Sequence, residues 1–240
     1  RDPEMSRGLG DVYKRQFPYL SCNWVDLRTT LRVLPSVKVF VRGGRRIAFV
    51  GVTTPETFTK STPAYFMNAK QTKYIYDILG GDDGRKLYDA VQKAIDKAKT
   101  LGADIIIGLG HLGVDPSSSP WTSEEVIANT TGFDAFIDGH SHSTLEEIKE
   151  ATNGTGKVGD TVLTSTGTKL ANVGMVDISP DGTISTSSIG GISKDETDGV
   201  WFKVTDGDVT TIVIKEAVSA AKTVISAAVK GNNIAVNPAA

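Results

Sequence analysis

The sequence is poor in the residues that usually crosslink a chain or bind a metal. It has one cysteine, Cys22, and three histidines among 240 residues. One cysteine excludes an internal disulfide, which fits a reducing compartment or an exported bacterial protein without disulfides. No apolar run is long enough to span a bilayer, so no transmembrane segment is predicted. The formal net charge of −2 gives no general attraction for a nucleic acid polymer.

The central part of the sequence has the pattern strand, helix, strand. The short apolar runs at 105–109 and 133–137 predict two buried strands. Between them, Thr122–Glu125 has the pattern of a capping box, and Gly132 is placed to end the helix that it opens. This spacing predicts a right-handed βαβ unit with parallel strands. Open α/β sheets bind their ligands at the carboxyl ends of such strands.

All three histidines follow these two strands. His111 follows the first, and His140 and His142 follow the second. Gly110 and Gly139, directly before them, would allow a sharp turn and close backbone approach. In an extended chain the rings of His140 and His142 would point to one side. Because imidazole is the commonest side-chain metal ligand, the pattern predicts a metal site. The alternative is that the histidines are ordinary polar residues at strand ends.

Two stretches carry a resemblance to a known family. Gly-His-Leu-Gly-Val-Asp at 110–115 and Phe-Asp-Ala-Phe-Ile-Asp-Gly-His-Ser-His at 133–142 resemble the C-terminal half of a calcineurin-like metallophosphoesterase domain, of the 5′-nucleotidase and UDP-sugar hydrolase type. Three further stretches agree with it: Phe17–Trp24, Arg45–Thr57 and Val162–Ser179. The resemblance implies an α/β (α+β) fold class: part of a four-layer αββα domain with mixed sheets and a C-terminal linker helix.

The resemblance also implies metal ligands. His111 and His140 would bind one ion and His142 the other, giving two divalent ions (Zn, Mn or Fe) in the intact parent. Asp138 and Asp115 would hold histidine N–H groups behind the ligands, or else cap loops. Glu56 would play a similar part or face the substrate; the alternative for Glu56 is a solvated turn residue.

The family has further motifs, which in its members precede the stretch that begins here at Phe17, and this chain does not carry them in that order. They are Asp-x-His, a Gly-Asp that supplies the bridging carboxylate, and Gly-Asn-His-Glu with its acid histidine. We therefore expect a fragment without catalytic residues of its own, inactive alone. Its parent would be a metal-dependent phosphoric ester hydrolase of nucleotide catabolism, exported to the periplasm, cell surface or medium, although no signal peptide is visible. The alternatives are a 2′,3′-cyclic-nucleotide phosphodiesterase with 3′-nucleotidase activity and a non-catalytic surface module. The nucleotide, the metal and the oligomeric state stay open.

The chain divides into four predicted parts. Residues 1–16 are polar, lack periodicity and form a non-native or disordered head. A partial metallophosphoesterase domain spans 17–205. A linker helix at 206–231 leads toward a missing C-terminal substrate domain, and 232–240 is a tail. The helix is predicted from apolar residues that recur at helical spacing between Val209 and Val229.

The remaining expected elements come from local patterns. Strands are predicted at Phe17–Cys22, Val37–Val41, Ile47–Val52, Thr161–Thr166, Leu170–Ile178 and Thr183–Ile189, the last three being successive and antiparallel. A helix is predicted from Arg85 to about Thr100, with Gly102 just after its end. The aromatic loop at 61–81 is expected to form a small satellite core.

Overall fold

The computed structural model describes residues 18–169, 171–189, 193–195, 200–206, 209–216, 223–229 and 232–235, with side chains up to residue 188. The chain forms two compact units. The first comprises the described residues up to Ser141 together with Lys157–Leu163, and the second comprises His142–Gly156 and the described residues from Thr164 onward. The predicted head, residues 1–16, lies outside the described residues. No described helix is both long and apolar enough to cross a membrane.

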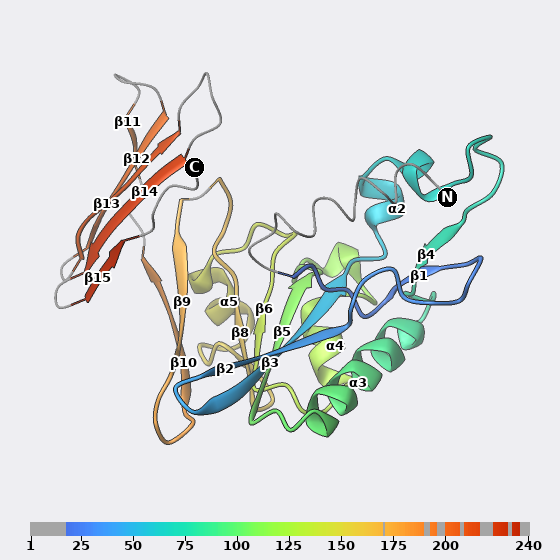
Figure 1. Ribbon diagram of the computed structural model, residues 1–240, viewed down its shortest axis with the longest axis horizontal. Coiled ribbons are helices and arrows are strands. Elements are labelled where there is room, and N and C mark those ends of the chain that lie inside the picture. The colour runs from blue at the N-terminus through green and yellow to red at the C-terminus, as the bar shows by residue number, and fades with distance from the viewer. Residues whose placement is uncertain are drawn as a thin grey trace. The chain divides into compact units, whose positions relative to one another are not determined.

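A six-stranded mixed sheet forms the centre of the first unit (Figure 1). Its strands, in spatial order, are β2 (Val37–Arg42), β3 (Arg45–Thr53), β5 (Ile105–His111), β6 (Ala135–Ile137), β8 (Thr161–Thr164) and β7 (Lys157–Val158). The β2–β3 hairpin turns at Gly43–Gly44, while β3, β5 and β6 run parallel. The mixed α/β class is confirmed; the four-layer arrangement stays a prediction.

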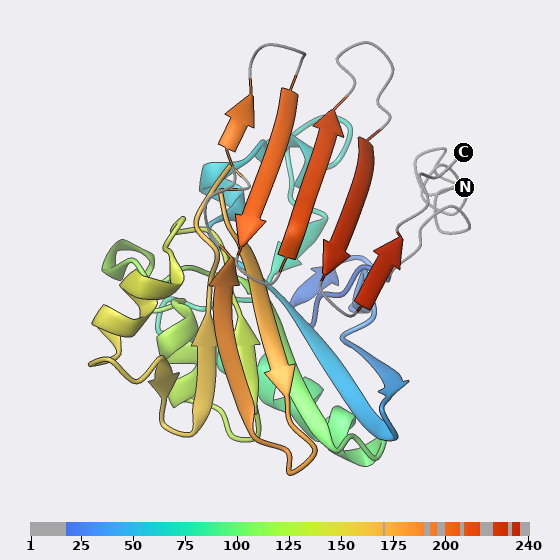
Figure 2. The same ribbon diagram turned by 90° about the vertical axis from the view of Figure 1, so that its left-hand side faces the viewer.

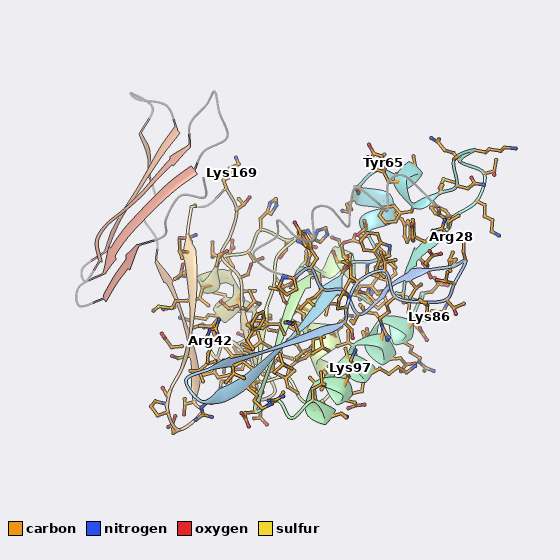
Figure 3. The ribbon with its side chains drawn as sticks, viewed as in Figure 1. Arg28, Arg42, Tyr65, Lys86, Lys97 and Lys169 are labelled. Carbon is orange, nitrogen blue, oxygen red and sulfur yellow. The ribbon has the colours of Figure 1, made fainter. Side chains whose placement is uncertain are left out.

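Helices connect the parallel strands. α3 (Arg85–Thr100) lies between β3 and β5 in the chain, and α4 (Ser123–Ala128) lies between β5 and β6. The buried residues of α3 recur at helical spacing: Leu87, Ala90, Val91, Ala94, Ile95 and Ala98. Its lysines are exposed, among them Lys86 and Lys97 (Figure 3). Burial of this apolar stripe explains why the helix forms where the sequence predicts it.

Two glycines in β5 make room for an aromatic ring from β6. A Cβ on Gly108 would lie 2.2 Å from Phe136 Cδ2, and one on Gly110 would lie 2.5 Å from Phe136 Cε1. Both distances are far below van der Waals contact, so only glycine fits at these two positions. Phe136 is fully buried. Gly110 lies inside β5, so the predicted sharp turn before His111 is wrong. Its lack of a side chain instead lets β5 and β6 pack closely up to their carboxyl ends.

The short elements at the start of the first unit pack around aromatic rings. They are β1 (Trp24–Asp26), α2 (Thr57–Lys60), the 3-10 helix η1 (Pro63–Phe66) and β4 (Tyr76–Ile78), with β1 antiparallel to β4. Phe58 packs against Phe66 and Tyr74, while Trp24 packs against Phe66 and Tyr76. The expected satellite core is thereby confirmed, although Tyr65 points to solvent (Figure 3).

The described residues of the second unit include one helix and two antiparallel sheets. α5 (Leu145–Ala151) is followed by the hairpin of β9 (Val173–Ile178) and β10 (Ile184–Ile189). A five-stranded meander then runs through β11 (Ser193–Asp195), β12 (Val200–Asp206), β13 (Val209–Glu216), β14 (Thr223–Val229) and β15 (Asn232–Ala235), whose strands lie side by side in Figure 2.

The predicted linker helix at 206–231 is wrong, because the described residues of this span form strands β13 and β14. β13 reads Val-Thr-Thr-Ile-Val-Ile-Lys-Glu, and six of its eight residues are β-branched. Branching at Cβ restricts side-chain rotamers in a helix and suits a pleated strand. A spacing of four residues between apolar positions, as between Val209 and Val213, also fits a strand, in which the side-chain direction repeats every second residue. The first residues of the predicted tail likewise form β15.

Three local predictions also need correction. Residues 18–22 form no strand; β1 begins only at Trp24. Helix α4 ends at Ala128 rather than near Gly132, because the side chains of Asn129 and Thr130 hydrogen-bond the carbonyls of Glu125 and Val126. Of the three late strands, β8 joins the six-stranded sheet while β9 and β10 form their own hairpin.

Candidate metal centre

Three turns meet at the carboxyl edge of the parallel strands. β3 ends at Thr53, which pairs in parallel register with His111, the last residue of β5. The turn after β3 carries Glu56, and the turn after β6 carries His140. Because parallel strands end at one edge of their sheet, residues far apart in the sequence come together here.

His111 and His140 lie next to each other. Their ring centroids are 4.9 Å apart and their planes are inclined by 62°. A Cβ on Gly139 would lie only 3.3 Å from His111 Nδ1, so the absence of a side chain there lets the backbone after β6 approach the ring. His111 is exposed, whereas the His140 side chain keeps 17% of its surface accessible. The two rings are therefore neighbours at this edge of the sheet; that they share one ion stays a prediction.

Glu56 contacts His140 directly. Its Oε2 lies 2.8 Å from His140 Nε2 and accepts a hydrogen bond of 2.7 Å from Ser118 Oγ. Lys60 Nζ lies 3.7 Å from Oε1. Burial alone would raise the pKa of Glu56, but the hydrogen bonds with Ser118 and His140 and the charge of Lys60 outweigh it, so the pKa is lowered. Glu56 is therefore not a solvated turn residue.

Asp138 holds the loop that follows His111. Its Oδ1 accepts from the Leu112 N–H and its Oδ2 from the Gly113 N–H, both at 2.9 Å. Burial raises the pKa of Asp138 despite these hydrogen bonds, which lower it. Asp138-Gly-His140 matches the sequence pattern of the family's Asp-x-His, but the Asp138 carboxylate accepts hydrogen bonds from backbone N–H groups here. Asp138 thus acts as the loop anchor that was the alternative for it.

Asp115 also serves a loop. Its carboxylate accepts a hydrogen bond of 2.8 Å from the Ser117 N–H and so caps the 3-10 helix η2 (Pro116–Ser118). That hydrogen bond is the main cause that lowers the pKa of Asp115. This arrangement matches the alternative for Asp115, a loop cap. The helix η2 that it caps contains Ser118, which the sequence analysis missed and which donates a hydrogen bond to Glu56.

His140 and His142 do not occupy extended chain. Their φ angles are +84° and +59°, in the left-handed region that residues other than glycine seldom adopt. The prediction that both rings point to one side because the chain is extended is therefore wrong. His142, an exposed residue, begins the second unit, and Thr144 just beyond it opens the capping box of α5. Left-handed residues cost of order 1–3 kcal/mol each and cluster at functional sites.

The donor set fits part of a coordination sphere. Two neighbouring imidazoles with a carboxylate behind one of them suit Zn, Mn or Fe. Among the residues that the structure describes, no group of three or more His, Cys, Asp or Glu side chains is arranged so that it could hold a metal ion. Metal binding by His111 and His140 stays a prediction.

One element near the site was missed although its signal is present. Thr144–Glu147 has the same capping-box pattern as Thr122–Glu125, and both boxes form with reciprocal hydrogen bonds. Helix α5 follows directly from the first of them. The Glu56–Ser118 contact, in contrast, joins residues 62 positions apart and has no local signal.

Comparison with known proteins finds a similar sequence over part of the chain. No family model matches the chain. A mouse (Mus musculus) 5′-nucleotidase is 33% identical over 147 residues, which is 58% of this chain and 21% of that protein. The chain thus spans about a fifth of the length of this curated relative.

Solved structures share the fold. The sulfate thiohydrolase SoxB of Thermus thermophilus, in complex with glycerol, superimposes with a TM-score of 0.55 at 18% identity, covering 77% of this chain and 30% of that one. A putative 5′-nucleotidase from Staphylococcus aureus, in complex with alpha-ketoglutarate, gives 0.50 at 19% identity, covering 80% and 35%. The resemblance that the histidine motifs predict is confirmed to this extent: the chain is similar in sequence to part of a 5′-nucleotidase and shares the fold of part of a putative 5′-nucleotidase and of SoxB.

Proposed function

We propose that this chain supplies part of a dinuclear metal centre in a phosphoric ester hydrolase that acts on nucleotides, as a 5′-nucleotidase does. The observation that supports it best is the 4.9 Å approach of the His111 and His140 rings at the carboxyl ends of β5 and β6. The identity to a 5′-nucleotidase supports the substrate class. Export from the cytoplasm belongs to the same proposal and rests on the family resemblance alone.

Each residue has a proposed task. His111 and His140 hold one divalent ion through their ring lone pairs, and His142 is the ligand of a second ion by family resemblance. Asp138 keeps the loop after His111 in place through two backbone hydrogen bonds. Bound divalent ions would supply a water nucleophile at neutral pH and offset charge on the phosphoryl oxygens.

These 240 residues contain no Gly-Asn-His-Glu motif, which in the family carries an amide ligand and the acid histidine. We therefore expect this chain to bind metal ions without hydrolysing nucleotides. The chain should bind Zn²⁺ or Mn²⁺ but release no phosphate from AMP at an enzymic rate.

Equilibrium dialysis of the 240-residue chain against Zn²⁺ and Mn²⁺ tests the binding. His111→Gln and His140→Gln should each weaken binding at least about 10-fold, because even the loss of a residue that only hydrogen-bonds a metal ligand has an effect of this size. Lys97→Gln, an exposed change on α3, is the matched control and should bind like the unsubstituted chain. Loss of the histidine dependence would support a non-catalytic module on the same scaffold. Phosphate release from AMP at an ordinary rate would refute the separation of binding from turnover.

A further inference from the structure

We propose that Glu56 is a positioning residue for His140: it accepts a hydrogen bond from His140 Nε2 and leaves Nδ1 as the nitrogen that binds a metal ion. The inference deepens the proposed function and rests on it only where it assigns an ion to His140. Its structural basis is the 2.8 Å contact between Glu56 Oε2 and His140 Nε2, across 84 residues of sequence.

The position of the proton follows from the neighbours of Glu56. Ser118 Oγ donates to the same oxygen, Oε2, at 2.7 Å. An ionised carboxylate only accepts hydrogen bonds. A second heavy atom 2.8 Å from that oxygen must therefore bring its own proton, so the proton of the imidazole lies on Nε2. A neutral imidazole has one N–H, which leaves the lone pair on Nδ1.

Contacts other than that with His140 also hold the Glu56 side chain in place. The Glu56 side chain keeps only 11% of its surface accessible. Its backbone N–H donates to Thr54 Oγ1 at 3.2 Å, Ser118 fixes Oε2, and Lys60 lies 3.7 Å from Oε1. Residues from the turns after β3, β5 and β6 thus form one chain of contacts: Glu56, Ser118 and His140.

The backbone of His140 makes this support useful. Its φ of +84° lies in the left-handed region, which disfavours side chains with a Cβ. A ring on such a backbone gains a fixed orientation from a partner on another element. Fixing the ring before a ligand arrives lowers the entropy lost on binding. Hydrogen bonds behind a ligand also raise its basicity and set its tautomer.

The experiment uses the full 240-residue chain, ¹⁵N-labelled at histidine and free of metal. The ¹H–¹⁵N spectrum should show a downfield imidazole N–H signal from Nε2 of His140, assigned by its loss in His140→Gln. Glu56→Leu should abolish the signal. Glu56→Gln should retain it, because the amide oxygen still accepts. Glu146→Gln, an exposed change at the start of α5, is the control and should leave it unchanged.

A Zn²⁺ titration of the same variants gives the second measurement. Glu56→Leu should bind Zn²⁺ about 10–100-fold more weakly, and Glu56→Gln should fall between it and the unsubstituted chain. If Glu56→Leu does not fold, by circular dichroism, Glu56→Asp takes its place, since its shorter side chain cannot reach both partners. A persistent N–H signal, or Zn²⁺ affinity independent of residue 56, overturns the positioning role and leaves the metal centre intact. No Zn²⁺ binding by the unsubstituted chain overturns the metal centre itself, and with it the role of Nδ1.

Discussion

Removing the Asp138 carboxylate should destabilise the first unit more than removing the carboxylate of Asp134, at the other end of β6. Asp138→Ala leaves the N–H groups of Leu112 and Gly113 without their acceptor, and both residues are buried. A buried donor without a partner costs about 1–3 kcal/mol. We expect a loss of about 2–4 kcal/mol in the free energy of unfolding, at the lower part of the summed range because neighbouring groups relax.

Asp134 provides a matched control at the opposite end of β6. Its carboxylate accepts one backbone N–H, that of Ile106, at 2.7 Å, and the residue is exposed. Water can replace that acceptor, so Asp134→Ala should cost about 1 kcal/mol or less. Urea unfolding followed by tryptophan fluorescence measures both losses. An Asp138→Ala cost no larger than that of Asp134→Ala would refute the role of Asp138 as the anchor of the loop.

The pH dependence of Asp138 has a defined sign. Burial raises the pKa of its carboxyl group in the folded state. A raised folded pKa means that the contribution to stability is fully present below the ordinary aspartate pKa and is lost as pH rises through the raised value. The stability of the unsubstituted chain relative to Asp138→Asn should therefore be largest in acid and shrink across this window. A difference that grows with pH would contradict the assigned cause.

Three further outcomes are expected. Burial raises the pKa of the Cys22 thiol to about 12, so thiol reagents should label it at pH 8 only as fast as the chain unfolds. The contribution of the neutral thiol to stability is fully present below its ordinary pKa and is lost only as pH rises through about 12. Thr122→Ala removes the capping box of α4 and should lower the free energy of unfolding by about 1 kcal/mol, measured with urea. Thr59→Ala, at an exposed position, is the control and should lower it by less. His140→Ala should weaken Zn²⁺ binding at least about 10-fold in equilibrium dialysis at pH 7.5; an affinity equal to that of the unsubstituted chain would exclude His140 as a ligand.

Local signals account for what the sequence could predict. The βαβ unit from 105 to 137 follows from two apolar runs and a capping box, each of which acts over a few residues. The approach of His111 and His140 then follows from parallel pairing at one sheet edge. Helix α5 was also predictable from its capping box, although the sequence after it favours strands.

The remainder depends on contacts that no local pattern encodes. The bond between Glu56 and His140 spans 84 residues, and the left-handed backbone of His140 arises in a histidine, where a glycine would have been the signal. The C-terminal helix prediction failed because a four-residue repeat is compatible with both helix and strand. Three-dimensional pairing of β13 with its neighbours decides between them.

The parallel register of β3 and β5 limits where the chain can change length. Thr53 pairs with His111 at the last position of a seven-residue ladder that begins with Ile47 and Ile105. Inserting one residue within β5 would shift His111 by about 3.3 Å and turn its ring to the opposite face. Insertions after His111, between β5 and α4, leave that ladder untouched. Homologous chains that keep the histidine pair should therefore differ in length in their loops and keep the strand from Ile105 to His111 at constant length.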